Sequence, residues 1–150
     1  MRYRWLLLLS LLLPVMPGVA GEATLDLDAY RGKVVYLDFW ASWCVPCRRS
    51  FPWLNEMRNK YGDDGFSVVA VNVDAERELA AGFLRETPAT FDIIYDPAGE
   101  IAAQWELIGM PSSFIIDRDG KVASRHVGFR SDSLEKYEAE IRRLLGKEVQ

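Results

Sequence analysis

Two apolar segments constrain the fold of this 150-residue chain more than any other feature. Residues 33–40 are KVVYLDFW and residues 66–74 are FSVVAVNVD, and both are rich in β-branched and aromatic side chains. Nearly continuous apolar runs are typical of strands that are buried on both faces of a sheet. The intervening segment has a helical pattern that starts near Cys44 and stops at Gly62, so we expect a strand–helix–strand unit.

The remaining pattern predicts shorter elements and a closing helix. We expect a helix at 75–87, a short strand at 91–96, a short helix at 99–107, strands at 112–117 and 122–128 joined by the turn RDGK, and an amphipathic helix within 131–147 capped by Ser131 or Asp132. This order predicts an α/β fold with a mixed central β-sheet, helices on both faces and an inserted β-α segment.

The N-terminus differs in character from the rest of the chain. Arg2 and Arg4 precede an apolar run over 5–13, and Gly18 and Ala20 supply the small residues of a cleavage site. This pattern predicts a signal peptide at 1–20 and one domain at 21–150. An uncleaved anchor is the alternative, although the apolar run is shorter than the roughly 20 residues of a spanning helix. Both interpretations place the domain outside the cytoplasm.

Charge and cysteine content narrow the class of protein. The net charge of -4, with bases and acids mixed along the chain, argues against a nucleic-acid-binding face. The only two cysteines are Cys44 and Cys47, and cysteines in an exported chain most often form a disulfide. A disulfide that closes so short a loop constrains the unfolded chain very little, so a purely structural role is a weak interpretation.

The spacing of Cys44 and Cys47 favours a redox couple. If a helix begins at Cys44, its free N–H groups and dipole favour a thiolate there, which lowers the Cys44 pKa. Cys44 is then the nucleophile, and Cys47, one turn later and deeper, attacks the mixed disulfide and releases the substrate. Val45 and Pro46 stiffen the connection, since proline suits the first turn of a helix.

Two further residues fit this chemistry. Asp38 interrupts the apolar run 33–40, and a buried carboxyl group with a raised pKa could accept the Cys47 proton. The alternative is an ordinary aspartate that faces solvent at the strand end. Pro111 precedes the strand at 112–117, and a cis Met110–Pro111 bond would bring the Met110 backbone beside the cysteines, where an extended peptide could pair with it.

These motifs together resemble the thioredoxin superfamily over roughly residues 25–146. The segment VVYLDFWASWCVPCRRSFP resembles the active-site segment, with the helix-kinking Pro52, and GMPSSFIIDRDGKV resembles the cis-proline loop and its hairpin. Gly128 matches the glycine after the last strand. The exported N-terminus and the inserted segment are closer to the TlpA/ResA-like branch. Many members of that branch carry Asn at the position of Asp38, and the dipeptide between the cysteines also varies, so both features tune the redox potential.

The resemblance implies an envelope thiol–disulfide oxidoreductase. It implies a periplasmic reductant of protein disulfides, supplied by a membrane-bound thiol donor and, as for some members of the branch, serving cytochrome c maturation. We expect a monomer whose only redox group is the Cys44–Cys47 disulfide, with no other cofactor and no metal. The implied site comprises Cys44, Cys47 and Asp38, with substrate contacts at Trp43, Val45, Pro46, Met110 and Pro111.

A copper carrier is the alternative function. Thiolates favour Cu(I), so Cys44 and Cys47, with His126, could hold that ion. Copper carriers of this fold, however, typically space their cysteines by three residues. Structural zinc is less plausible, because a four-ligand site lacks enough Cys and His. Of the tryptophans, we expect Trp43 to be exposed, Trp40 to line the site, and Trp53 and Trp105 to be packing residues.

Overall fold

The computed structural model describes residues 24–147, which fold around one sheet. Three short 3-10 turns accompany the helices and strands. The elements are η1 (Asp28–Tyr30), β1 (Val34–Trp40), α1 (Val45–Tyr61), η2 (Gly62–Asp64), β2 (Phe66–Asn72), α2 (Arg77–Glu86), β3 (Asp92–Tyr95), α3 (Glu100–Gln104), β4 (Ser112–Ile116), β5 (Val122–Val127), η3 (Ser131–Ser133) and α4 (Leu134–Leu144).

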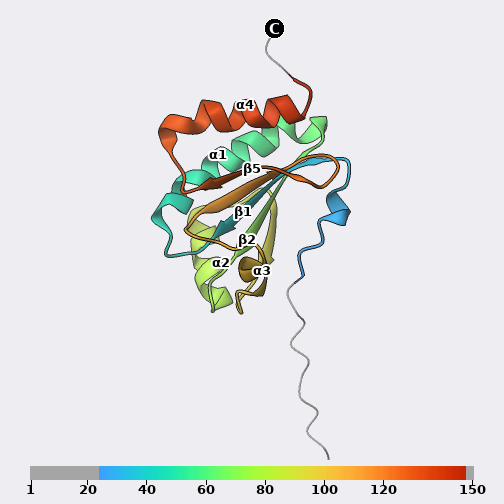
Figure 1. Cartoon of the computed structure of the whole chain (residues 1–150). Helices are drawn as coiled ribbons and strands as arrows, with labels where there is room; N and C mark the ends of the chain where they lie inside the picture. The colour runs from blue at the N-terminus through green and yellow to red at the C-terminus, as the bar shows by residue number, and fades with distance from the viewer. Residues whose placement is uncertain (1–23, 148–150) are drawn as a thin grey trace, which may run out of the picture.

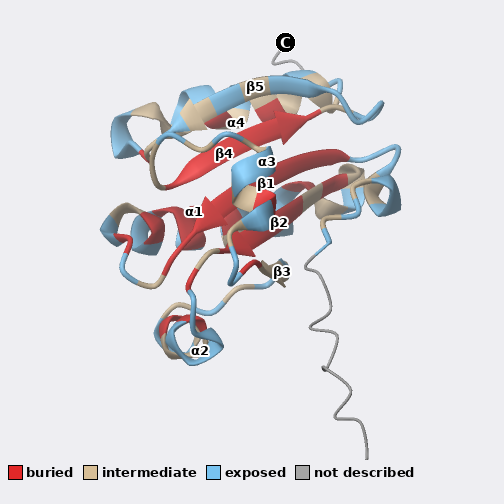
Figure 2. Cartoon of the chain, turned by 60° about the horizontal axis from the view of Figure 1, so that its bottom comes forward, coloured by how far each residue is buried: buried red, intermediate tan, exposed pale blue. Residues whose placement is uncertain are grey.

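The five strands are arranged in the order β3-β2-β1-β4-β5. The pairs β1–β2 and β2–β3 are parallel, whereas β4 pairs antiparallel with both β1 and β5. All seven residues of β1 are buried, as the continuous apolar run predicts for a central strand. Figure 2 shows buried residues concentrated on β1, β2 and β4, with exposed residues on the edge strand β5. The predicted mixed sheet is confirmed.

The two faces of the sheet hold separate apolar cores because side chains alternate along each strand. Tyr36 and Trp40 of β1 belong to the core that includes residues of α1, α2 and α4. Leu37 and Phe39 belong to the core that includes Ile101 of α3. Figure 1 shows α1 and α4 lying together along one side of the sheet. Helices therefore cover both faces, as predicted.

The ends of several helices differ from the sequence-based expectation. Helix α3 ends at Gln104, whereas the predicted short helix extends to residue 107. The last helix begins at Leu134, after the 3-10 turn η3, so the predicted cap at Ser131 or Asp132 is wrong. The N-cap is Ser133, and its side chain makes no capping hydrogen bond. Helix α1 stops before Gly62 as predicted, but the left-handed glycine is Gly65, at the end of η2, with φ of 89°.

The predicted signal or anchor at 1–20 lies outside the described residues. Within residues 24–147, no helix has the length and apolar content needed to cross a membrane. Residues 24–147 lie within the domain predicted at 21–150.

The aromatic cluster beneath α1 generates a stability prediction. Phe51 is fully buried, and its ring packs 4.9 Å from Trp40 and 5.0 Å from Phe83, measured between ring centroids. Phe51→Ala removes these contacts and leaves a cavity, so we expect the free energy of unfolding to fall by about 3–5 kcal/mol. Urea denaturation measures this change. Val122→Ala, at a residue that is 52% exposed, serves as the control and is expected to change it by less than about 0.5 kcal/mol.

Candidate active site

The two cysteines form a disulfide at the amino end of α1. Their Cα atoms lie 5.3 Å apart, and the Cys47 N–H donates to the Cys44 carbonyl oxygen at 3.1 Å. Cys44 has extended backbone geometry and occupies the N-cap position, so the helix begins directly after it, as predicted. Pro46 lies in the first turn, where its missing N–H leaves no helical hydrogen bond unmade. Cys44 therefore lies at the amino end of α1, where the helix dipole favours negative charge.

Exposure around the disulfide is uneven. Trp43 and Val45 are 66% and 67% exposed, which confirms the prediction for Trp43. Cys44 and Cys47 are themselves buried, at 3% and 0% exposed, so the predicted contrast between an accessible and a buried cysteine is small in the disulfide form. Pro46 is half-buried. Two exposed apolar side chains thus flank a disulfide that is otherwise enclosed.

Asp38 lies within the sheet and does not face solvent. It is 1% exposed, and its Oδ2 atom has no hydrogen-bond partner among the described residues. The alternation along β1 places its side chain on the same face as Tyr36 and Trp40, the face whose core includes both cysteines. Loss of hydration raises the pKa of the Asp38 carboxyl group well above its ordinary value. The predicted burial and direction of the pKa shift are confirmed.

The proline loop lies on the same side of the fold. The Met110–Pro111 peptide bond is cis, as predicted. The Pro111 carbonyl oxygen accepts a hydrogen bond from the Gly128 N–H at 2.7 Å, which ties the loop to the end of β5. The Met110 side chain is half-buried against both cores. The backbone hydrogen bonds within residues 24–147 leave the Met110 N–H and carbonyl unused.

Sequence reasoning missed Asp74, which holds the loop before Cys44. Its Oδ2 accepts from the Ser42 N–H at 2.9 Å and from Asn72 Nδ2 at 2.8 Å, and its Oδ1 accepts from Ser42 Oγ at 2.8 Å. Asp74 is 3% exposed. The available signal was its position two residues after the end of β2, because the carboxyl ends of parallel strands meet at one edge of the sheet.

The structure also tests the predictions made for the three other tryptophans. Trp53 packs against Tyr36 at 5.6 Å, and Trp105 packs against Phe114 at 4.7 Å, measured between ring centroids, so both are packing residues as predicted. Trp40 is fully buried and shares a core with both cysteines. It is thus packed beneath the site and has no exposed surface there.

The third residue of the copper alternative is engaged elsewhere. His126 Nε2 lies 2.8 Å from Glu140 Oε2, beneath α4. Among residues 24–147, no three His, Cys, Asp or Glu side chains are grouped so as to hold a metal ion. The arrangement therefore gives the copper alternative no support.

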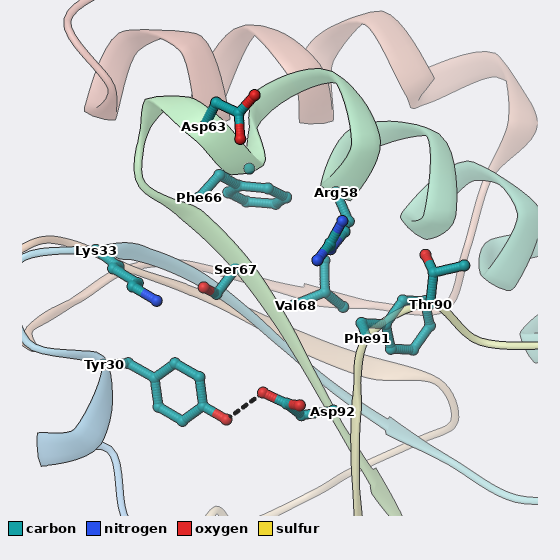
Figure 3. A pocket seen from close by; sticks show the side chains of 11 residues that line it. Tyr30, Lys33, Arg58, Asp63, Phe66, Ser67, Val68, Thr90, Phe91 and Asp92 are labelled. Carbon is teal, nitrogen blue, oxygen red and sulfur yellow. Dashed lines mark hydrogen bonds between the residues drawn. The ribbon is translucent and has the colours of Figure 1, made fainter.

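A polar pocket lies at the other end of the parallel strands. Lys33, Arg58 and Ser67 line it, and the Tyr30 hydroxyl donates to Asp92 Oδ2 at 2.6 Å across its floor (Figure 3). The pocket borders the first residues of β2 and β3, whereas Cys44 follows the last residue of β1. It is therefore separate from the disulfide.

The comparisons with known proteins agree with this geometry. The family model described as Redoxin matches residues 17–141. This chain belongs to the Redoxin family. Among curated members, ResA from Bacillus thuringiensis subsp. konkukian is 34% identical over 114 residues, covering 75% of this chain and 66% of that protein. ResA from Bacillus subtilis is 27% identical over 110 residues, covering 73% and 62%. The matched region thus spans slightly less than two thirds of these relatives.

Solved structures place the chain in the same group. A Chlorobium tepidum protein assigned as thiol:disulfide interchange protein DsbE has a TM-score of 0.79 and 52% identity, covering 80% of this chain and 85% of that one. StoA from Bacillus subtilis has a TM-score of 0.61 and 27% identity, covering 72% and 81%. The resemblance to the TlpA/ResA-like thioredoxin group is confirmed, and these findings support the predicted thiol–disulfide oxidoreductase activity.

The burial of Asp38 generates a pH-dependent stability prediction. In the folded state its pKa is raised, whereas in the unfolded chain it returns to about 3.9. Between these two pKa values the folded state binds the additional proton, so stability falls as pH rises from about 4 through the folded-state pKa. We expect Asp38→Asn to remove this slope and to be more stable than the natural protein at high pH.

Urea denaturation of both oxidised proteins at a series of pH values measures the effect. The difference between the two stabilities cancels the contribution of all other titrating groups. A difference that does not change with pH would show that Asp38 is ionised at an ordinary pKa in the folded protein.

Proposed function

We propose that this chain is a thiol–disulfide oxidoreductase that reduces protein disulfides outside the cytoplasm. The observation that carries the proposal is the Cys44–Cys47 disulfide at the first turn of α1, in the core that borders the buried carboxyl group of Asp38. Membership of the Redoxin family and similarity to proteins named as thiol–disulfide oxidoreductases support it.

In the reduced protein, Cys44, Cys47 and Asp38 each carry out one step in the reduction of a substrate disulfide. The Cys44 thiolate attacks a substrate disulfide, because the free N–H groups at the start of α1 stabilise negative charge there. One substrate sulfur leaves as a thiolate, and the other stays bonded to Cys44. Cys47 then attacks the Cys44 sulfur of this mixed disulfide, which releases the second substrate thiolate and restores the Cys44–Cys47 bond. Asp38 accepts the Cys47 proton during this second attack.

The surface around the disulfide suits an extended protein segment. Trp43 and Val45 are exposed beside it, and the half-buried Pro46 lies between the cysteines. The backbone of Met110, set by the cis bond to Pro111, is free to pair with a substrate strand. We infer that these five residues contact the substrate near its disulfide.

The proposal also covers where the domain acts, which protein supplies its electrons and which pathway it serves. The charged and apolar pattern of residues 1–20 supports a signal peptide or an anchor, and therefore a periplasmic domain. A domain that reduces disulfides there needs an electron source, which we propose is a membrane-bound thiol protein. Cytochrome c maturation is the proposed pathway, on the resemblance to the TlpA/ResA-like branch. We propose that the domain acts as a monomer.

The division of roles between the cysteines is tested by trapping. Cys47→Ala keeps the nucleophile but removes the group that releases the substrate, so mixed disulfides at Cys44 should accumulate. Reduced protein is incubated with an oxidised model protein and analysed by non-reducing electrophoresis and mass spectrometry. Cys44→Ala is the matched control and should trap little. Stronger trapping by Cys44→Ala would reverse the two roles.

The direction of electron flow is tested by the redox potential. A buried acid near the dithiol disfavours a second negative charge, so the dithiolate is stabilised less than in a strong oxidant. We expect a potential nearer the thioredoxin value of about -270 mV than the strong-oxidant value of about -120 mV. Equilibration with glutathione buffers measures it.

Chemical denaturation gives an independent check on that direction. The disulfide form should be the more stable one, because a redox state favoured by folding is also favoured in the redox equilibrium. A dithiol form that is more stable than the disulfide form would identify an oxidant.

A further inference from the structure

An open depression lies between the first turns of α1 and the loop that follows β5. We call it the arginine depression, and it is lined by Arg49, Phe129, Arg130, Ser131 and Asp132. These five residues belong neither to the proposed catalytic set nor to the predicted substrate contacts. Their position relative to the disulfide nevertheless follows from the helix and from the loop that form the two walls.

One wall of the arginine depression continues the surface of α1 from Pro46. Residues three or four apart on an α-helix are neighbours on one face, so Arg49 follows Pro46 and Trp53 follows Arg49. The Trp53 ring packs 5.9 Å from the ring of Phe129, measured between centroids. The helix face that begins at Pro46, between the two cysteines, therefore leads into the depression.

The other wall adjoins the proline loop. The Gly128 N–H donates to the Pro111 carbonyl oxygen at 2.7 Å, and Phe129 is the next residue along the chain. Phe129 is buried in the core that includes both cysteines. A protein segment that contacts Pro46 and pairs with the Met110 backbone therefore borders the arginine depression on both sides.

Arg49 carries a positive charge that is not neutralised within the depression. It is exposed, and it makes no ion pair in the part of the chain that the structure describes. The neighbouring Arg48 pairs with Glu86 Oε2 at 2.8 Å, and Arg130 pairs with Asp132 Oδ2 at 2.7 Å. The depression thus presents one unneutralised cation beside the disulfide, although the net charge of the whole chain is -4.

We propose that the arginine depression favours substrate proteins with an acidic side chain close to their disulfide. This inference rests on the proposed function, because it names which substrates the dithiol reduces best. When a substrate sulfur is bonded to Cys44, a Glu or Asp next to it reaches Arg49 across Pro46, about one helical turn away. A guanidinium group holds a carboxylate by two parallel charge-assisted hydrogen bonds. Arg49 touches no reacting atom, so it binds and positions the substrate.

The exposure of Arg49 sets the size and the timing of the effect. An ion pair at an exposed site contributes little free energy, so the depression gives a preference of a few fold and no absolute requirement. The attraction acts while the substrate approaches, and it therefore speeds formation of the mixed disulfide. Salt should weaken the preference, because exposed charges are screened by ions.

The test compares three peptides that differ only in charge beside the disulfide. Each is a symmetric disulfide dimer with Glu, Gln or Lys at the two positions on each side of its cysteine. Each reaction moves two electrons and two protons from the dithiol to the peptide, and gives two peptide thiols and the Cys44–Cys47 disulfide. Acid quenching and chromatography measure the second-order rate constant. The charge preference is the rate constant for the Glu peptide divided by that for the Lys peptide.

Arg49→Gln removes the unneutralised charge, and we expect it to lower the charge preference about fivefold at low salt. Comparing the two proteins on the same peptides cancels the intrinsic reactivity of each peptide. Arg49→Lys keeps the charge and should keep most of the preference. Added 1 M NaCl should lower the preference of the native protein toward that of Arg49→Gln.

Arg58→Gln is the matched control. Arg58 is exposed on the same helix and its substitution removes the same charge, but it lines the polar pocket at the other end of the parallel strands (Figure 3). Its charge preference should stay at the native value. An equal fall in Arg58→Gln and Arg49→Gln would assign the preference to net charge and overturn the inference.

Asp132→Asn tests the same surface in the opposite direction. It releases Arg130 from its ion pair, so the arginine depression becomes more positive and the charge preference should rise. This variant takes the place of Arg49→Gln if that protein does not fold. A preference that stays at the native value in Asp132→Asn would then overturn the inference.

The Gln peptide separates failure of this inference from failure of the proposed function. Reduction of the Gln peptide, with a preference that falls in Arg49→Gln and stays in Arg58→Gln, supports the arginine depression. Reduction of the Gln peptide, with the same preference in the native protein and in Arg49→Gln, overturns the depression and keeps the oxidoreductase. No reduction of any of the three peptides overturns both.

Discussion

The burial of the Asp38 carboxyl group is the constraint on which the rest of the site depends. A carboxyl group enclosed in an apolar core destabilises the fold when it ionises, so the surrounding sheet and helices must supply the stability that it removes. The fully buried strand β1 does this, with β2 and β4 paired on either side and the aromatic cluster around Phe51 above it. The stable core thereby keeps an unfavourable acid on the sheet face whose core includes both cysteines.

The disulfide depends on a second set of polar contacts at the same edge of the sheet. Asp74 binds the backbone and side chain of Ser42, two residues before Cys44, and so fixes the loop that leads into α1. The cis Met110–Pro111 bond and the bond from Gly128 to Pro111 fix the loop on the other side. The cysteines lie at the start of α1, the acid lies in β1 and the proline loop directly precedes β4, so three separate elements hold these groups.

Local sequence patterns were sufficient to predict most helices and strands, and to predict that a helix starts at the cysteine pair. The apolar runs identified β1 and β2, and the Asp-Gly turn identified the β4–β5 hairpin, because strand period and turn chemistry act over a few residues. The start of α1 at Cys44 followed from Pro46 and the helical pattern after it. The start of the last helix was less predictable from local sequence. Ser131 and Asp132 are both residue types that favour an N-cap, but residues 131–133 form a 3-10 turn and α4 begins after it.

The sequence by itself identified two cysteines, an interrupting acid and a proline before a strand as candidates, and the resemblance to the thioredoxin superfamily is what joined them in one site. Only the tertiary structure decided which distant residues join them. Asp74 meets Ser42 because parallel strands end at the same edge of the sheet. Strand register places Ser113 opposite Asp38, and His126 opposite Ser113. Register depends on pairing between segments more than 70 residues apart along the chain, as with Asp38 and Ser113, and no local pattern encodes that pairing.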